Sequence, residues 1–455
     1  MGTESRDRTA TRRRSSPVTA AAPRRTRPAN RKATILAVAS ERFAREGYHR
    51  TSMADIAAEV GISSTALYRH FRNKQDLLGR TLIDGLDRTL AGVQQAVGHP
   101  EQPDGESGPG QPGPAPDPVL AESIIAGLVD QSLTHRRLTA LWQREVKALS
   151  EEDRRAVLVR VARVHRWVLR AVTALRPELD AGRGEMLAWF ALSAAVSPTQ
   201  HNVQLPRAVF AAQLRELTTA VIHADLPAAP ATPSASDGDG VGEAGASPTV
   251  RDGSVDRVLR RELLIAAATR LFDERGYAAV GIEDIGAAAG ISGPSVYHHF
   301  GSKAELLAEI VDRNEQWIRL YTARAMRGGG TSHESLVLLL RSYAEFAIEH
   351  PDLIGTTVTE VVHLPVDEAR RCRRAHREGV VTWARLLQVV RPELTVDQAR
   401  VAVQAATAVV GDAVRNGRLR ARPHLADELV AAGTALLLGR GDESGSEGSG
   451  QPRIS

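Results

Sequence analysis

Two forty-residue stretches of this chain repeat a single pattern. Residues 39–78 and 268–307 align without a gap at an offset of 229, and sixteen of the forty positions are identical. The shared positions include a Gly-Tyr pair, an Asp-Ile pair, a Gly-Ile-Ser triplet, and a Tyr-x-His-Phe-x-x-Lys run followed by Leu-Leu. Chance alignment of two such stretches gives far fewer identities, so the chain contains the same unit twice.

The first copy predicts two short helices joined by a tight turn. Apolar residues recur at helical spacing from residue 35 onward, and Gly47 ends that helix. Ser52 is the expected N-cap of the next helix, and Asp55 three residues later completes a capping-box arrangement. Gly61 lets the chain reverse, and Ser63 can cap a second short helix. This pattern indicates a helix-turn-helix, whose second helix enters the DNA major groove.

These residues resemble the DNA-binding domain of the tetracycline-repressor (TetR) family of bacterial one-component transcription regulators. The resemblance covers about fifty residues in each copy. It implies an all-α chain of two fused units, each with a helix-turn-helix head and a helical body for ligand binding and dimerisation. The expected domains are a disordered basic arm (1–30), a first DNA-binding domain (31–78), a first body (79–224), a flexible linker (225–256), a second DNA-binding domain (257–307), a second body (308–438) and a disordered tail (439–455).

Composition supports a helical chain without a membrane segment. Aromatic residues make up 4% of the chain, and no long alternation of β-branched residues appears. The longest apolar runs are too short to span a bilayer, so no membrane partner is expected. Cys372 is the only cysteine, which excludes an intrachain disulfide and suits a reducing cytosol. We therefore expect a cytoplasmic protein.

Catalytic and metal-binding motifs do not appear in the sequence. There is no Gly-rich phosphate loop, HExxH pair, CxxC pair or nucleophile elbow, so we expect no enzyme, no metal site and no cofactor. The arginines beside Cys372 could lower the pKa of its thiol and make a redox sensor. A solvated basic helix face is the favoured alternative.

Positive charge is concentrated at the N-terminus. Residues 1–32 carry ten Arg or Lys against two acidic residues, whereas the whole chain has a formal net charge of +4. This arm either keeps the protein soluble or lies along DNA phosphates or in the minor groove, as homeodomain arms do.

Positions within the motif assign roles in DNA binding. Ser64, Thr65 and Arg69 are the candidates for contacting base edges. The resemblance places Tyr68, His70 and Lys74 at the phosphate backbone. The complete candidate set is Thr51, Ser52, Ser63, Ser64, Thr65, Tyr68, Arg69, His70 and Lys74 in the first copy, and Ser292, Gly293, Pro294, Ser295, Tyr297, His298, His299 and Lys303 in the second.

The second copy departs from the first at the presumed contacts. Val280 and Gly281 stand where the first copy has Thr and Ser, so the N-cap is a weaker glycine. Pro294 and His298 replace Thr65 and Arg69. The two heads should therefore recognise unlike half-sites, or the second should bind DNA weakly.

The duplication continues into the bodies. Arg-Pro-Glu-Leu occurs at 176–179 and again at 391–394, and Glu145 aligns with Glu360 at the same offset of 215. The resemblance implies that the last two helices of each body, residues 185–224 and 396–438, form a four-helix dimer interface. It also implies a small-molecule pocket, for which the aromatic candidates are Trp142, Trp167, Trp189 and Phe190 in the first body and Trp317, Tyr321, Tyr343, Phe346, His363 and Trp383 in the second.

The linker decides how the halves can pair. A flexible segment of about thirty residues spans roughly 30 Å, close to the roughly 34 Å between half-sites one DNA turn apart. The two bodies can therefore pair as a single-chain pseudo-dimer. A homodimer with four heads is the alternative.

These features predict a ligand-responsive DNA-binding regulator. We expect it to bind a double-stranded DNA operator, asymmetric if the heads differ, and to release the DNA when a small hydrophobic ligand binds a body. Repression is favoured over activation. The alternatives are a non-specific architectural DNA-binding protein and a ligand-sequestering module with a degenerate second head.

Overall fold

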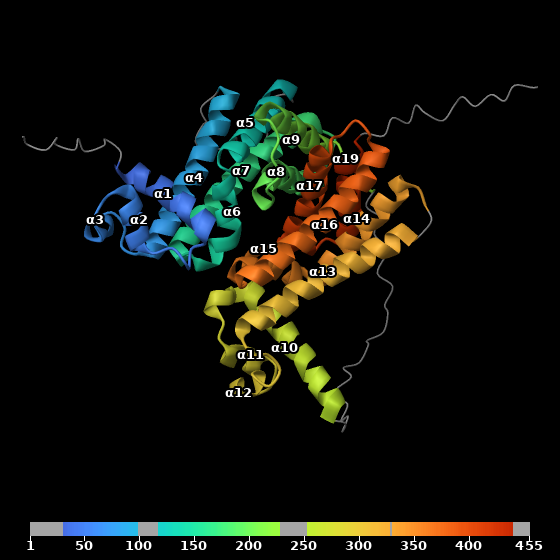
Figure 1. Cartoon of the computed structure of the whole chain (residues 1–455). Coiled ribbons are helices and arrows are strands. Elements are labelled where there is room, and N and C mark those ends of the chain that lie inside the picture. Colours follow the sequence, from blue (N-terminus) through green and yellow to red (C-terminus); the bar gives the residue numbers. More distant parts are fainter. Residues whose placement is uncertain (1–30, 99–116, 228–252, 328–329, 440–455) are drawn as a thin grey trace, which may run out of the picture.

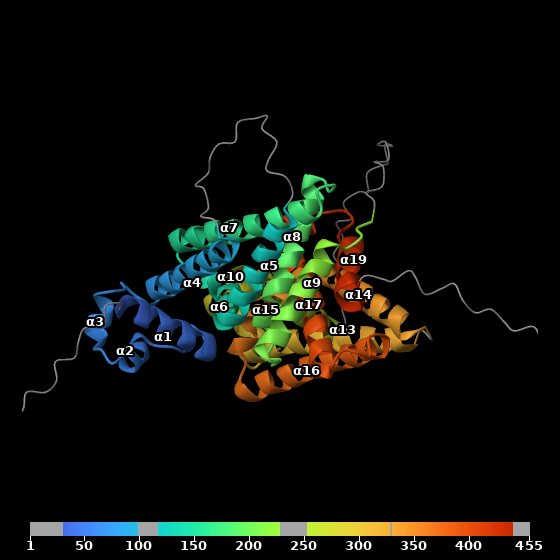
Figure 2. The same cartoon turned by 90° about the horizontal axis from the view of Figure 1, so that it is seen from above.

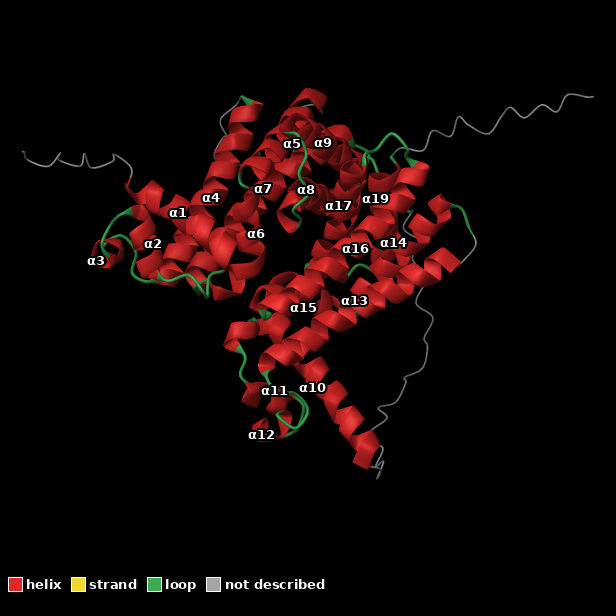
Figure 3. Ribbon diagram, viewed as in Figure 1, coloured by secondary structure: helices red, strands yellow, loops and turns green. Residues whose placement is uncertain are grey.

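The computed structural model describes residues 31–98, 117–227, 253–327 and 330–439. Within these ranges every regular element is a helix (Figure 3), and no helix is long and apolar enough to cross a membrane. The prediction of an all-α chain with two fused units is confirmed. The predicted basic arm, linker and tail lie almost entirely outside the described residues.

The two halves have the same order of helices. The first half contains α1 (Arg31–Glu46), α2 (Met53–Val60), α3 (Ser64–Tyr68), α4 (Lys74–Val97), α5 (Pro118–Thr134), α6 (Arg136–Glu145), η1 (Val146–Ala148), α7 (Glu151–Leu175), α8 (Ala181–Val196), η2 (Ser197–Gln200) and α9 (Arg207–Ile222). The second half contains α10 (Gly253–Arg275), η3 (Tyr277–Ala279), α11 (Ile282–Ala288), α12 (Gly293–Val296), α13 (Lys303–Arg327), α14 (Ser332–Glu349), α15 (Pro351–Glu360), η4 (Val361–His363), α16 (Val366–Val390), α17 (Val396–Arg415), α18 (Gly417–Arg420) and α19 (Leu425–Leu438).

Each half begins with a small head that has a hydrophobic core of its own. In the first head the buried face of α1, including Ile35 and Phe43, packs with Leu67 of α3 and with the start of α4. The second head repeats this arrangement around Phe272 and Val296. The first head (blue) and the second head (olive and yellow) occupy different corners of the molecule (Figure 1).

The bodies, in contrast, share one hydrophobic core. The apolar residues of α5, α7, α8 and α9 form a single buried cluster with those of α14, α16, α17 and α19. Alanines in the middle of this cluster, such as Ala191 of α8 and Ala405 of α17, are fully buried and let the helices approach closely. Removal of this apolar surface from water therefore holds the two halves together.

Helices α8 and α9 of the first half pack against α17 and α19 of the second (Figure 2). These are the helices for which a dimer interface was expected, and here they pair within one chain. Polar contacts frame the apolar centre. The side chain of Gln213 donates to the carbonyl of Gln398 at 2.7 Å, and Arg391 forms an ion pair with Glu216 at 3.3 Å.

Glu315 is one of the buried carboxyl groups of the second body. Glu315 of α13 is 5% exposed, whereas the first half has Leu86 at the equivalent position. Burial is the main cause that raises the pKa of Glu315, to about 7. The folded state therefore holds this proton at pH values where the unfolded chain has released it.

We predict that Glu315→Gln removes a pH dependence of stability. The pKa of Glu315 lies above that of the unfolded chain, so wild-type stability falls as pH rises from about 4.5 to 7, by about 2–3 kcal/mol. The variant should lack this slope and should be the more stable protein at pH 8. Urea unfolding at a series of pH values measures it, with Glu349→Gln, a change at an exposed carboxylate that does not act on Glu315, as control. Equal slopes in wild type and Glu315→Gln would contradict the assignment.

Candidate nucleic-acid interface and ligand pocket

The first helix-turn-helix has the caps that the sequence predicted. The hydroxyl of Ser52 accepts from the amide of Asp55 at 3.1 Å, and the Asp55 carboxylate accepts from the amide of Ser52 at 3.0 Å. Gly61 ends α2 in the left-handed conformation, with φ of 71°. Ser63 then caps α3 by accepting from Ala66 at 3.1 Å. Because both helices are closed by their own side chains, the angle between them is fixed locally.

The exposed side of α3 carries the candidate DNA contacts. Ser64, Thr65, Arg69 and His70 are exposed, and Tyr68 is 52% exposed. The helix ends at Tyr68, so Arg69 and His70 follow it in a turn. On the other side, apolar residues of α3 and of the turn are buried in the head core. The arrangement leaves one polar surface that can approach a nucleic acid.

Lys74 is held inside the head rather than pointing away from it. Its ammonium donates to the carbonyls of Tyr48, His49 and Thr51 at 3.0, 3.3 and 3.1 Å, and lies 4.5 Å from the centre of the Tyr48 ring. Burial lowers the pKa of Lys74. Lys303 makes the same contacts in the second head, with two carbonyls at 2.8 Å. Both lysines were predicted as phosphate contacts. Lys74 ties the α1–α2 loop to α4, and Lys303 ties the α10–α11 loop to α13.

Thr51 also has a structural position. It is 1% exposed, and its hydroxyl donates to the carbonyl of Gly47 at 3.0 Å. This buried hydroxyl is satisfied within the loop and does not face solvent. Of the first copy's candidates, Thr51 and Lys74 therefore belong to the scaffold that supports the exposed ones.

The second helix-turn-helix lacks the caps of the first. Gly281 has no side chain to cap α11, so only Asp284 remains of the box, accepting from the Gly281 amide at 2.8 Å. The Ser292 hydroxyl bonds to that of Ser295 at 2.6 Å and makes no cap hydrogen bond. Helix α12 spans only four residues. Pro294, Tyr297 and His298 are exposed, whereas Gly293, Ser295, His299 and Lys303 are half-buried.

An acidic residue lies beside the second contact surface. Glu283 packs against the first residue of α12, because a Cβ added at Gly293 would be 3.3 Å from Cγ of Glu283. The first copy has Ala54 at that position. A carboxylate there repels DNA phosphates, so the second head has the weaker electrostatics for DNA binding.

One buried carboxylate joins each head to its body. The two residues are aligned in the repeat, but the sequence alone gave them no role. Glu145, at the end of α6, accepts from the backbone amide of Tyr48 at 3.3 Å, and Glu360, at the end of α15, accepts from that of Tyr277 at 3.1 Å. Burial raises the pKa of Glu145. These bonds place the α1–α2 and α10–α11 loops on the bodies.

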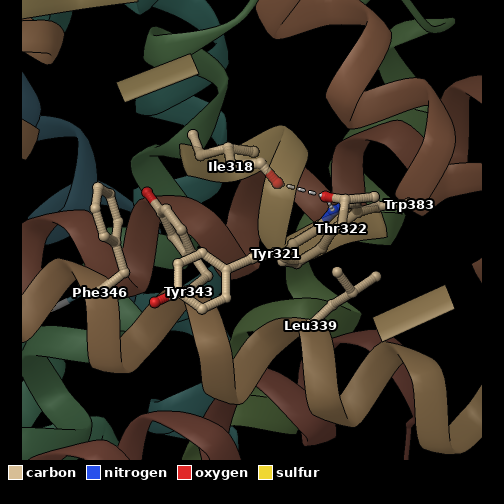
Figure 4. A pocket seen from close by; sticks show the side chains of 7 residues that line it. All are labelled: Ile318, Tyr321, Thr322, Leu339, Tyr343, Phe346 and Trp383. Atoms are coloured by element: carbon tan, nitrogen blue, oxygen red, sulfur yellow. Dashed lines mark hydrogen bonds between the residues drawn. The ribbon is translucent and has the colours of Figure 1, made fainter. Parts of the chain in front are cut away.

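Four of the six aromatic candidates in the second body line one cleft. Tyr321, Tyr343, Phe346 and Trp383 surround it with Ile318, Thr322 and Leu339, from α13, α14 and α16 (Figure 4). Trp317 stacks on Tyr321 and on Phe346, with ring centres 5.7 and 5.8 Å apart. The indole of Trp383 donates to the Thr322 hydroxyl at 3.4 Å. The cleft has room for little more than one water molecule, so a ligand must move α13 from α14 to enter.

The remaining candidates do not join this cleft. His363 stacks on Tyr277 at the root of the second head, with ring centres 5.0 Å apart. In the first body, Trp142 packs against the head core, Trp167 and Phe190 lie in the shared body core, and Trp189 stacks on His165 at 4.1 Å. The structure therefore does not bring the first body's four aromatics to one cavity.

The repeat explains this difference between the bodies. The first half has Arg88, Gly92, Leu128, Gln131 and Val168 where the second has Trp317, Tyr321, Tyr343, Phe346 and Trp383. Its α4 and α5 also pack very closely, because a Cβ added at Gly127 would lie 2.8 Å from the Cβ of Ala96. The side chain of Gln131 fills the space over Gly92. Aromatic rings thus separate the helices in one body only.

Cys372 is a half-buried, unbonded cysteine on α16. Burial raises the pKa of its thiol, with the nearby carboxylates adding to the shift and Arg371 opposing it. The arginines therefore do not produce the lowered pKa that a redox sensor needs.

Both heads match a family model, and parts of the chain are similar to known transcription regulators. The model of the bacterial regulatory proteins of the tetR family matches residues 35–81 and 264–310. The transcriptional activator FasR of Mycolicibacterium smegmatis is 33% identical over 100 residues, which are 22% of this chain and 45% of FasR. The transcriptional repressor KstR2 of Rhodococcus jostii is 48% identical over 64 residues, 14% of this chain and 31% of KstR2. The solved structure of KstR2 from Mycobacterium tuberculosis is 26% identical with a TM-score of 0.36, covering 40% of this chain and 93% of that one.

The two heads thus have the helix-turn-helix architecture of a DNA-binding domain. The chain therefore carries two copies of the DNA-binding domain of the tetR family of bacterial regulatory proteins. It spans less than half the length of either curated relative named above.

We predict that Lys74→Met lowers the stability of the first head. The change removes a cation from three backbone carbonyls and should cost about 1–3 kcal/mol. Arg69→Ala, on the exposed surface, should stay within about 0.5 kcal/mol of wild type. Chemical denaturation followed by circular dichroism compares the two. A Lys74→Met protein as stable as wild type would show that the internal contacts contribute little.

Proposed function

We propose that this protein is a ligand-responsive transcription regulator that acts as a single-chain pseudo-dimer on operator DNA. The observation that carries the proposal is the fully capped first helix-turn-helix with its exposed polar surface. Local caps fix that surface for docking into a major groove. Such a regulator acts on chromosomal operators, so a cytoplasmic location is part of the proposal.

The shared body core supports pairing within one chain. The four helices that join the halves, α8, α9, α17 and α19, all come from the same polypeptide. A tether between the halves keeps their effective concentration at about the millimolar level, which favours this pairing over pairing between chains. The competing arrangement is a homodimer with four heads.

The heads are proposed to contribute unequally to DNA binding. The first supplies most of the affinity, because it has both caps and no acidic residue corresponding to Glu283. The second supplies fewer contacts through Tyr297 and His298, which are its exposed candidates with side chains able to reach a phosphate. The operator is then asymmetric.

Repression is the proposed direction of regulation. Relatives named as repressors include KstR2 and BdcR, whereas FasR is named as an activator. A repressor that leaves its operator on binding a ligand needs two conformations whose affinities for that ligand differ.

The cleft of the second body is the proposed ligand site. Its rings favour a hydrophobic or aromatic ligand, and the Tyr343 hydroxyl, whose pKa burial raises to about 12, remains able to donate a hydrogen bond. A ligand that separates α13 from α14 must displace α13. Because α13 begins at Lys303, which is bonded to the α10–α11 loop, the displacement moves the second head.

An architectural DNA-binding protein and a ligand-sequestering module are the other candidates. The second head lacks the side-chain cap of its second helix, which favours a module whose second head is partly degenerate. The exposed, capped surface of the first head favours retained sequence recognition, which neither alternative requires.

In vitro selection from random duplex DNA tests the function. We predict an asymmetric site, and we predict that Arg69→Ala relaxes the base preference in one half of it, with a loss of about 1–3 kcal/mol for the preferred sequence. His298→Ala should alter the other half and by less. Wild-type protein that selects no sequence at physiological salt would contradict the regulator assignment, and a symmetric site would contradict the unequal heads.

A fluorescent apolar probe tests the ligand site. We predict that 8-anilinonaphthalene-1-sulfonate binds one molecule per folded chain, and that Leu339→Trp, which fills the cleft, weakens this binding at least tenfold. Trp189→Phe in the first body is the matched control and should bind as wild type does. Both variants must give a circular dichroism spectrum close to that of the wild type, because overpacking a core lowers stability by about 1–3 kcal/mol. Two probe molecules per chain, or unchanged binding by Leu339→Trp, would place the site elsewhere.

A further inference from the structure

The two halves also contact each other where the heads join the bodies, away from the shared body core. A Cβ added at Gly276 would lie 3.8 Å from Cδ of Lys147, and one added at Gly47 would lie 3.4 Å from Cγ2 of Val362. Gly47 and Gly276 are equivalent in the repeat, as are Lys147 and Val362. The short helix after α6 or α15 in each half therefore packs against the end of the first head helix of the other half.

Lys147 makes polar contacts across this junction. Its ammonium donates to the carbonyl of Phe272 at 3.2 Å and lies 3.7 Å from both the Asp273 and the Glu360 carboxylates. All three partners belong to the second half, and two of them lie in the last turn of α10. A cation at a helix C-terminus is favourable because the unpaired carbonyls there carry partial negative charge.

The partners of Lys147 are largely shielded from water. The side chain of Glu360 is 5% exposed and that of Asp273 is 33% exposed. Burial raises the pKa of Asp273, and Lys147 is the strongest charge that opposes the shift. Beside these contacts, residues of the two halves line an open cleft of about 270 Å³. Because this cleft separates the surfaces of the two halves, the few side chains that bridge it determine how the halves are oriented here.

The ion pair exists on one side of the pseudo-twofold arrangement only. The position equivalent to Lys147 is Val362, and the position equivalent to Asp273 is Ala44. If two first halves paired with each other, Lys147 would face an alanine. If two second halves paired, Val362 would face an aspartate. Both members of the pair are present only when a first half meets a second half.

We propose that Lys147 is a positioning residue that holds the second head at a fixed distance from the first. Its contacts with Phe272, Asp273 and Glu360 attach α10 to the first half, while the pseudo-equivalent contact between Val362 and Gly47 is apolar. The position of the second head thus depends on the junction as well as on its own body. The consequence for DNA binding rests on the proposed function, but the position of the head does not.

Distances between nitroxide labels test the head position without DNA. The labels are placed on Ala58→Cys and Ala287→Cys, which are exposed and equivalent in the two heads, in a Cys372→Ser background. We expect a narrow distance distribution in the otherwise wild-type chain. Lys147→Val and Asp273→Ala, each taken from the other side of the repeat, should broaden it at least twofold. The double variant should be no broader than either single one, and Lys147→Arg should stay narrow.

Arg154→Ala, which removes an exposed ion pair with Glu151 outside the junction, is the matched control and should not broaden the distribution. Circular dichroism confirms that each variant is folded. A narrow distribution in folded Lys147→Val overturns the proposal. Broadening that adds fully in the double variant also overturns it, because independent effects would show that the two side chains do not act as a pair.

A spacing assay then measures the consequence on DNA. Two base pairs are inserted between the half-sites of the selected operator, which should weaken wild-type binding at least tenfold and Lys147→Val binding less than threefold. Equal sensitivity to the insertion overturns the role in DNA spacing. Absence of any selected operator for wild type refutes the proposed function instead, and leaves the label distances to decide on the head position.

Discussion

The structure depends on one buried apolar surface that neither half can cover alone. Helices α8 and α9 expose an alanine-rich face that must pack against something, and α17 and α19 supply a similar face on the same chain. In a homodimer such a face meets an identical copy. Here it meets a diverged copy, so the two sides of the interface are free to differ. The halves differ elsewhere as well, in the helix caps of the heads and in the aromatic cleft.

The asymmetries are distributed between the halves in a consistent way. The first half has the capped head and a body in which Gln131 closes the space over Gly92. The second half has the uncapped head, the aromatic cleft and the buried Glu315. A rigid body suits a head that must keep its geometry on DNA, whereas a body that a ligand can open suits a head that must move. The duplication separates two demands that a symmetric dimer places on the same residues.

Local sequence signals predicted the heads well, because caps and turns act within four residues. Ser52, Gly61 and Ser63 took their expected roles for that reason. The internal contacts of Lys74 were not predicted, because its spacing shows where it lies on a helix and not that its ammonium reaches carbonyls more than twenty residues earlier. Its contact with a phosphate stays a prediction. Glu145 and Lys147 act across the fold and gave no local signal. The cleft was partly predictable, because Tyr321 and Gly92 occupy equivalent positions in the repeat.

The placement of the cleft constrains how a ligand can influence the first head. Displacement of α13 reaches the second head directly through Lys303, whereas none of the helices that line that cleft runs into the first head. The effect must cross either the shared body core or the junction at Lys147. The body core is densely packed with small residues and resists deformation. The junction lies beside an open cleft and is bridged by few side chains, so it is the part that can change at lower cost. Under the proposed function, a ligand in the second body would therefore act chiefly by changing the distance between the heads, while each head retains its own shape.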